Sequence, residues 1–313
     1  MMTLGSLWRH STSYTSPFRV LRCYGLRAVH PANTLRRRIL ARKSTAALSA
    51  EQNQRKDIME REGCVPANPD TDQHLIKQLC ANLQERAKGV QIDMEAKPGK
   101  NYWERMLTDD DKKSDSLIVR CALQPAVINM AAAYLGEVPY LAGISVYLSH
   151  GTHNTTWQAS QLWHCDYDDR RMFKLFVYCT DVKGGPDGEF TYIPKDLSKN
   201  VKNNFFPARI SDESMDKQGY SKHAKHITGP AGTAFYIDTR GCYHLGSRVD
   251  IGHTRIAYIV TYVTAASLQP FNNGIKIQHA LTETEQLVLR SGMHSEVVHQ
   301  GNALAMNQGG PAM

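Results

Sequence analysis

The second half of the chain, from Tyr140 onward, carries apolar residues in short runs instead of at helical spacing. β-Branched and aromatic residues fill these runs, and clusters of glycine, proline and asparagine separate them, which is typical of strands. The predicted strands cover residues 141–149, 172–182, 190–193, 233–238 and 254–263. Several short strands without intervening helices favour an antiparallel barrel or jelly roll.

The chain before residue 140 follows the helical period. Helices are predicted over residues 49–61, 72–88 and 125–134, and a further helix over 282–290. Ser49 is a plausible N-cap, because Gln52 stands three residues later as in a capping box. Pro125 suits the first position of a helix, and Gly136 suits its end. We therefore expect a mainly β fold with flanking helices, of the α+β class.

Composition divides the chain into three parts. Residues 1–47 form a basic N-terminal extension, residues 48–295 a single domain, and residues 296–313 a flexible C-terminal tail ending in Gly-Gly-Pro-Ala-Met. Within the domain, the stretch 195–225 is polar and rich in lysine, asparagine and serine. We predict that this stretch is a loop over the mouth of the barrel, where a lid would lie.

The positive charge of the chain is concentrated at its start. The formal net charge is +7, yet residues 1–50 contain nine Lys and Arg and no Asp or Glu, so the rest is close to neutral. The domain itself therefore gives little reason to expect nucleic acid as a partner. Two readings of residues 1–47 stay open: a mitochondrial transit peptide, or a basic amphipathic helix on the domain surface built on Leu35, Ile39 and Leu40. We favour a cytoplasmic protein, with a mitochondrial one as the alternative, and expect the domain to tolerate removal of this segment.

The seven cysteines form an odd set without a Cys-x-x-Cys pair, which indicates reduced thiols and not a disulfide framework. The sequence contains no run of about 18 apolar residues, so we expect no transmembrane helix. It does not predict an oligomeric state.

A metal site is predicted at His164 and Asp166. One residue separates them, so on an extended backbone both side chains leave on the same face and can reach one ion. His244 ends a later apolar run, and two imidazoles with one carboxylate form the donor set of non-heme Fe(II) oxygenases. The remaining histidines of the polar segments are expected to be solvated: His150, His153, His223, His226 and His253.

Three further residues are candidates for binding a co-substrate. Arg255 opens the strand 254–263, where an inward guanidinium could pair bidentately with a carboxylate; the alternative is a surface arginine beside Asp250. Ser247 could add a hydroxyl to the same carboxylate, or serve only as a turn residue. Lys174 lies in an apolar strand and either faces the pocket or extends to the barrel end.

These motifs together resemble the phytanoyl-CoA dioxygenase family over residues 48–263. The resemblance rests on Gln-Leu-Trp-His-Cys-Asp-Tyr-Asp-Asp from Gln161, on the strand from Phe173, on Gly-Pro-Asp-Gly-Glu-Phe-Thr-Tyr-Ile-Pro, and on the spacing of His244 and Arg255. It implies a double-stranded β-helix (jelly-roll or cupin-like) barrel. It also implies Fe(II) held by His164, Asp166 and His244, and 2-oxoglutarate bound through Arg255. The stretch from Ile193 to Asp196 departs from the family's usual Pro-Gly-Ser-His pattern, so substrate contacts there cannot be carried over.

By this resemblance the chain would be a dioxygenase that hydroxylates an unactivated C–H bond of a small molecule. It would use Fe(II), 2-oxoglutarate and O₂, with ascorbate as an optional addition, and release succinate and CO₂. Asp166 is a carboxylate where halogenating relatives have a small residue, which favours hydroxylation. The alternatives are a cupin-like metal-dependent hydrolase or isomerase, which would more naturally use three histidines, and a non-catalytic binding module. The substrate class stays open among acyl-CoA thioesters, amino acids, sugars and secondary metabolites.

Overall fold

The fold is built on a six-stranded antiparallel sheet in the order β1-β7-β4-β9-β3-β2. The computed structural model describes residues 16–95, 101–202, 209–268 and 272–293. The strands of this large sheet are β1 (Cys64–Pro66), β2 (Trp103–Arg105), β3 (Tyr140–His150), β4 (Phe173–Tyr178), β7 (Ala234–Ile237) and β9 (Thr254–Val263). The two longest strands, β3 and β9, pair over their whole length.

Strand β9 shows how the sequence builds both faces of this sheet. Its even-numbered residues from Ile256 to Tyr262 are buried in the core beneath the helices. The hydroxyls of Tyr258 and Tyr262 donate to the carbonyls of Ile118 and Ala122. Its odd-numbered residues, from Arg255 to Thr261, line a cavity on the opposite face. Because side chains alternate along a strand, one apolar run serves the core and the cavity at once.

A second, three-stranded sheet lies on the cavity side. It has the order β6-β5-β8, with β5 (Phe190–Tyr192), β6 (Lys225–Ile227) and β8 (His244–Leu245). An antiparallel bridge between His164 and His244 continues this sheet by one further segment. The predicted jelly-roll architecture with flanking helices is confirmed, although the described strands form two sheets and not a closed ring.

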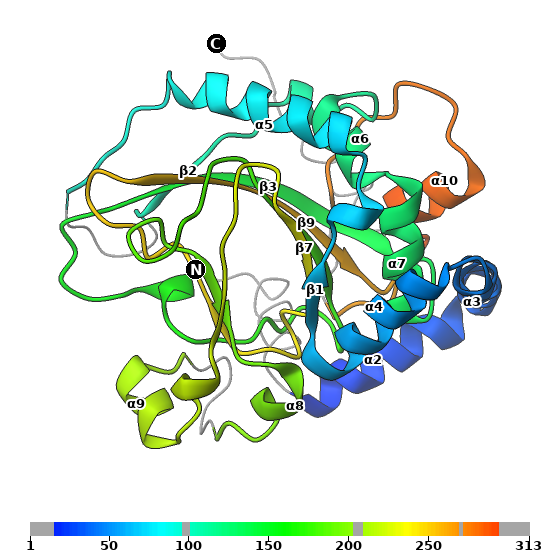
Figure 1. Ribbon diagram of the computed structural model, residues 1–313. Helices are drawn as coiled ribbons and strands as arrows, with labels where there is room; N and C mark the ends of the chain where they lie inside the picture. The colour runs from blue at the N-terminus through cyan, green and yellow to red at the C-terminus, as the bar shows by residue number, and fades with distance from the viewer. Residues whose placement is uncertain (1–15, 96–100, 203–208, 269–271, 294–313) are drawn as a thin grey trace, which may run out of the picture.

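Helices cover the other face of the large sheet (Figure 1). They are α4 (Ala50–Glu62), α5 (Gln73–Ala87), α6 (Leu117–Ala122) and α7 (Pro125–Leu135). The apolar face of α5, predicted from Leu75, Ile76, Leu79 and Leu83, is buried in the main core together with β4 and β9. Short 3₁₀ turns lie at Asn68–Asp70, Asp110–Lys112, Ala159–Gln161 and Ser221–His223.

The predicted helix boundaries are confirmed by their caps. Ser49 and Gln52 form the capping box of α4, and Gly136 ends α7 in the left-handed conformation with φ 76°. Near the end of the domain, Thr282 caps α10 (Glu283–Leu289) through a box with Glu285. The helix α6 and the strands β1, β2 and β6 were not predicted, since three to six residues are too few for a period to show.

The N-terminal segment folds as α2 (Ser16–Val29) and α3 (Pro31–Ala46), and α3 packs onto the domain with Thr34, Arg37 and Ala41 buried. The Arg37 side chain is fully buried and donates to the carbonyls of Val138, Pro139, Leu287, Arg290 and Ser291. A boundary at residue 48 stays a prediction, and residues 1–15 and the predicted tail at 296–313 lie outside the described residues.

The stretch 195–225 is more structured than the predicted loop. It contains α8 (Lys195–Ser198) and α9 (Asp212–Lys217), whose N-cap Ser211 accepts from the Ser214 amide. These helices were not predicted because they are short and polar. A helix of one or two turns needs few apolar residues to anchor it, so no helical period shows in the sequence. Among the described residues, no helix has the length and apolar character needed to cross a membrane, and all seven cysteines are free thiols.

Candidate metal centre

Three side chains converge between the two sheets. His164 and Asp166 lie on the segment beside β8, and His244 begins β8 itself. One ligand atom from each of the three lies within 4.8 Å of the others, and no further group of this kind occurs among the described residues. The backbones of His164 and His244 exchange two hydrogen bonds, of 3.0 and 2.9 Å, which fix the distance between the two imidazoles.

Hydrogen bonds to the backbone set the tautomer of both histidines. Nδ1 of His164 lies 2.8 Å from the Leu162 carbonyl oxygen, and Nδ1 of His244 lies 3.1 Å from that of Cys242. A carbonyl oxygen can only accept, so each Nδ1 carries the proton in the neutral ring. Each Nε2 then keeps its lone pair for an ion, as in metal sites whose histidines are oriented by backbone partners.

The protonation states also suit a divalent metal. Burial lowers the pKa of His164, and it lowers the pKa of His244 to about 3, so both rings are neutral at pH 7. Burial alone would raise the pKa of Asp166, but Lys174 and the two histidines outweigh it and hold that pKa well below its usual range. Two neutral imidazoles and one carboxylate are therefore available, which is the donor set of mononuclear non-heme iron sites.

Lys174 faces the metal ligands. Its ammonium lies 2.6 Å from Oδ2 of Asp166, and about four-fifths of each side chain is buried. Oδ1 of the same carboxylate points to the histidines, 4.0 Å from Nε2 of His164. Of the two orientations considered from the sequence, Lys174 adopts the pocket-facing one, and its contact in this structure is with Asp166.

Arg255 is 4 % exposed, so the surface alternative beside Asp250 is wrong. One guanidinium nitrogen donates to the Gly188 carbonyl and another to Ser247 Oγ at 2.8 Å, while Nε is buried without a partner. Among the described residues no carboxylate forms an ion pair with it. A buried cation without a counter-ion is costly, so an anionic ligand is its natural complement.

Ser247 holds Arg255 from an unusual backbone conformation. Its φ is 61°, a left-handed value that residues other than glycine rarely adopt. The hydroxyl accepts from Arg255 and from Ser149, while the Ser247 carbonyl accepts from the side-chain amide of Gln161 at 2.9 Å. Strain of this kind persists where surrounding contacts determine it, and it is common at functional sites.

The three candidate metal ligands and Arg255 line one cavity of about 380 Å³, which is within the usual range for small-molecule sites. One wall comes from alternate residues of the large sheet, paired across strands as Ser149 with Arg255 and Tyr147 with Ala257. The other wall comes from the small sheet and carries the three ligands. The cavity thus joins a metal donor set to a buried cation.

Several cavity residues were missed by sequence reasoning. Trp103 stacks on Tyr147 at 4.2 Å between ring centroids, and Arg209 lines the same cavity. Tyr147 could have been found from the spacing of Ser145, Tyr147 and Ser149 on one predicted strand. Trp103 and Arg209 carried no such signal, because their flanking segments show no period.

His150 corrects one expectation. It was expected to be solvated, but it ends β3 and is 2 % exposed, with Nδ1 3.0 Å from the Gly151 carbonyl. The strand ends one residue later than predicted, so the His150 ring is part of the strand and is buried. The other histidines expected to be solvated, His153, His223, His226 and His253, are exposed.

No family model matches this chain, and no curated protein is similar to it in sequence. Solved structures are similar at low identity. The epimerase SnoN in complex with Fe³⁺, alpha ketoglutarate and nogalamycin RO is 15 % identical (TM-score 0.47; 69 % of this chain, 84 % of that one). EctD from S. alaskensis with 2-oxoglutarate and 5-hydroxyectoine is 16 % identical (TM-score 0.46; 70 % of this chain, 77 % of that one). HygX from Streptomyces hygroscopicus with nickel and 2-oxoglutarate is 14 % identical (TM-score 0.44; 76 % of this chain, 93 % of that one). At these scores the similarity carries no assignment of its own.

Proposed function

We propose that this chain is an Fe(II)- and 2-oxoglutarate-dependent oxygenase that hydroxylates a small molecule. The observation that carries the proposal is the joint presence, in one cavity, of the donor set His164, Asp166 and His244 and the unpaired buried cation Arg255. The donor set suits a metal with open coordination positions, and Arg255 suits the far carboxylate of a dicarboxylic acid. A resemblance to the phytanoyl-CoA dioxygenase family fits this proposal but has no matching family model.

Each residue would have a separate task. The three ligands would hold Fe(II), while Lys174 would keep Oδ2 of Asp166 occupied and leave Oδ1 for the metal. Arg255, braced by Ser247, would bind the distal carboxylate of 2-oxoglutarate. When bound, Fe(II) and 2-oxoglutarate supply the oxidising chemistry that turns O₂ and a C–H bond into a hydroxylated product, succinate and CO₂. The cavity walls would exclude water from this region.

The substrate would lie against the part of the cavity not used by the co-substrate. The stacked pair Trp103 and Tyr147 offers an aromatic face there, and Arg209 offers a positive charge. The proposal therefore covers a small organic substrate without specifying its class. A hydrolase using three histidines is less well supported, because the described residues bring only two histidines and one carboxylate together.

The direct test is to add Fe(II) and then 2-oxoglutarate to the metal-free protein without oxygen. A chelate of the keto acid to Fe(II) should give a weak visible charge-transfer band, which neither a hydrolase nor a binding module would produce. Admission of O₂ should then yield succinate, faster in the presence of the right metabolite from a screened library. Absence of both the band and succinate, in protein that binds Fe(II), would overturn the proposal.

A further inference from the structure

The turn between β7 and β8 contacts two of the three candidate metal ligands. This turn, residues 238–242, follows β7 directly and leads into His244. The Thr239 carbonyl accepts from the Asp166 amide at 2.8 Å, and the Cys242 carbonyl lies 3.1 Å from Nδ1 of His244. The conformation of the turn therefore sets where the Asp166 backbone lies and how the His244 ring is oriented.

Asp238 closes this turn and is almost completely buried, at 1 % exposed. Its Oδ1 accepts from the amides of Arg240 and Gly241, at 3.1 and 3.0 Å, and from the Met172 amide at 3.3 Å. Its carbonyl accepts from the amides of Gly241 and Cys242, both at 3.0 Å. These hydrogen bonds to one residue hold the turn and join it to the segment before β4.

The second oxygen of the Asp238 carboxylate faces a phenol and a cation. Oδ2 accepts from the Tyr134 hydroxyl at 2.5 Å and lies 3.1 Å from the Lys195 ammonium. The ammonium also donates to the Tyr134 hydroxyl at 2.6 Å. Burial and the neighbouring carboxylate raise the pKa of Tyr134, so this phenol stays protonated and donates to Asp238. The three side chains thus form a closed triangle of contacts.

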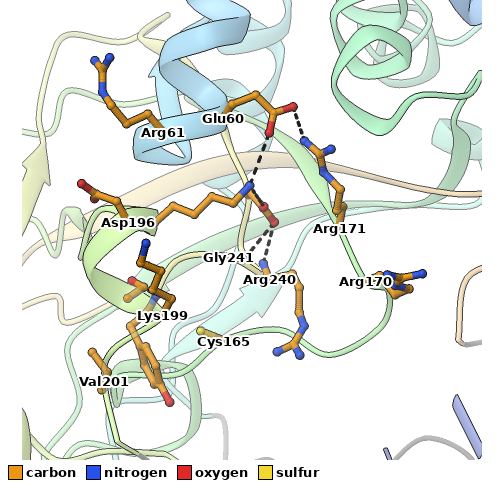
Figure 2. A pocket seen from close by; sticks show the side chains of 14 residues that line it. Glu60, Arg61, Cys165, Arg170, Arg171, Asp196, Lys199, Val201, Arg240 and Gly241 are labelled. Atoms are coloured by element: carbon orange, nitrogen blue, oxygen red, sulfur yellow. Dashed lines mark hydrogen bonds and ion pairs between the residues drawn. The ribbon is translucent and has the colours of Figure 1, made fainter. Parts of the chain in front are cut away.

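A second carboxylate lies near the ammonium of Lys195, which begins α8. The ammonium is 4.0 Å from Oε2 of Glu60, and the other oxygen of Glu60 accepts from Arg171 at 2.5 Å. Figure 2 shows this cluster, with dashed contacts running from Arg171 and Glu60 down to the backbone at Arg240 and Gly241. Side chains from α4, from α8 and from the segment before β4 therefore meet at the turn after β7.

Gly241 shows how closely these groups approach the turn. A Cβ atom at this position would lie 2.7 Å from Oδ2 of Asp238 and 3.0 Å from Cδ and Cε of Lys195, too close for ordinary packing. Glycine therefore lets the carboxylate and the lysine stem lie against the backbone. Lys195 comes from the stretch between Ile193 and Asp196, in which the sequence departs from the usual family pattern.

We propose that Asp238, held by Lys195 and Tyr134, is a positioning residue for the metal centre. The ion pair fixes the carboxylate, the carboxylate fixes the turn, and the turn fixes the Asp166 backbone and the orientation of the His244 ring. None of the three positioning side chains belongs to the ligand group or lines the metal cavity, so their effect reaches the ion only through the turn. This role rests on the metal site of the proposed function, but it requires neither 2-oxoglutarate nor turnover.

The test is to titrate the metal-free, full-length protein with Co(II) and to record the visible bands of the bound ion, which report the geometry of its ligands. Asp238→Asn keeps the size of the side chain but removes the charge that Lys195 pairs with. Co(II) affinity should fall by about threefold to tenfold, less than the 10- to 100-fold typical of residues that contact a ligand side chain directly, and the bands should shift. Lys195→Met removes the same ion pair from the other side and should change both readouts in the same direction.

Asp70→Asn is the matched control. Asp70 is also a buried carboxylate, at 7 % exposed, and it pairs with Arg55 at 2.6 Å. Its partners Gln52 and Arg55 lie on α4 and not on the turn. Asp70→Asn should therefore lower the unfolding temperature while Co(II) affinity and the visible bands stay as in wild type. The same change of the bands in Asp70→Asn as in Asp238→Asn would overturn the positioning role, because any loss of stability would then produce it.

Lys195→Met keeps the test decisive if Asp238→Asn does not fold. The Lys195 side chain is a quarter exposed, and its loss leaves the hydrogen bonds within the turn in place. Wild-type affinity and bands in folded Lys195→Met would overturn the role of the ion pair. Wild-type protein that binds Co(II) normally but forms no chelate of Fe(II) with 2-oxoglutarate would contradict the proposed function and leave the positioning role standing. No Co(II) binding by the wild type would overturn both.

Discussion

The Lys174 ammonium and the Asp166 carboxylate form an ion pair of 2.6 Å, so a protein cation already occupies one oxygen of the predicted metal ligand. A metal ion must therefore share this carboxylate with lysine. The pair explains how a carboxylate can stay ionised between two imidazoles in the metal-free protein, and it makes the charge balance of the cavity dependent on Lys174.

Replacement of Lys174 by methionine should destabilise the metal-free protein and increase the stabilisation gained from metal. Loss of one partner from a buried pair costs about 3–5 kcal/mol, and partial exposure here reduces the expectation to about 1–3 kcal/mol. Co(II) then supplies the missing positive charge, so its effect on the unfolding temperature should be larger in Lys174→Met than in wild type. Lys174→Arg is the control that retains the charge; equal metal-induced shifts in all three proteins would contradict this account.

Asp166→Ala should abolish metal binding and turnover while leaving the fold intact. The carboxylate is one of three candidate ligands, whereas the apolar core lies on the opposite face of the large sheet. Asp168→Asn is a matched control, because Asp168 lines the same cavity but does not belong to the ligand group. Metal affinity is measured by Co(II) titration and turnover by succinate release without added formate. Normal turnover by Asp166→Ala would remove Asp166 from the ligand set.

Arg255→Ala should weaken 2-oxoglutarate binding by a factor of about 30 or more. Loss of one partner from a buried charge pair costs about 2–5 kcal/mol, and about 1.4 kcal/mol corresponds to tenfold in affinity. Arg255→Lys should rescue only in part, since an ammonium lacks the planar fork. Titration of the Fe(II) chelate band measures the affinity, and Fe(II) binding itself should persist. Unchanged affinity in Arg255→Ala would point to Lys174 as the co-substrate's partner.

Arg37→Met should lower the free energy of unfolding by about 2–4 kcal/mol, because it leaves buried carbonyl oxygens without donors. Arg38→Met, at the next position of α3 where the side chain is exposed, should change it by less than about 0.5 kcal/mol. Urea denaturation of both variants measures the difference. For the same reason, removal of residues 1–47 should destabilise the domain, contrary to the expectation from composition; a truncated chain as stable as the full one would show that the contacts of α3 are dispensable.

Stability of the metal-free protein should fall as the pH drops below about 6.5. His244 has a pKa of about 3 in the fold, far below the value of an unfolded histidine, so only the unfolded chain gains a proton in this range. Between pH 7.5 and 5.5 this one residue should cost about 1.4 kcal/mol. Asp169, whose pKa burial raises to about 6, acts in the opposite direction, so the comparison is with His244→Gln. That variant should lose this part of the pH dependence; identical profiles would contradict a buried neutral His244.

The sequence predicted the long elements and which three side chains converge as candidate ligands, because the long elements and the His164–Asp166 pair depend on short-range patterns. The pair His164 and Asp166 needs only the alternation of a strand, and the caps at Ser49 and Gly136 follow from local backbone chemistry. Burial of Arg37 could not be predicted, since its partners lie about 100 and 250 residues away. The same holds for Arg209, which reaches the cavity from a segment without a period.

The two hydrogen bonds between the backbones of His164 and His244 fix the spacing of these two residues independently of most side chains around them. Two of the three ligands are neighbours on a strand ladder, so their spacing does not depend on the loops that shape the rest of the cavity. The stretch 195–225 supports this ladder at two points, where Ile210 exchanges two backbone hydrogen bonds with Trp163 and the Ser198 hydroxyl accepts from the Tyr243 amide. Substitutions elsewhere in that stretch leave the spacing of the two histidines unchanged. If the proposed function holds, a chain of this design can change its substrate during evolution while it keeps its metal site.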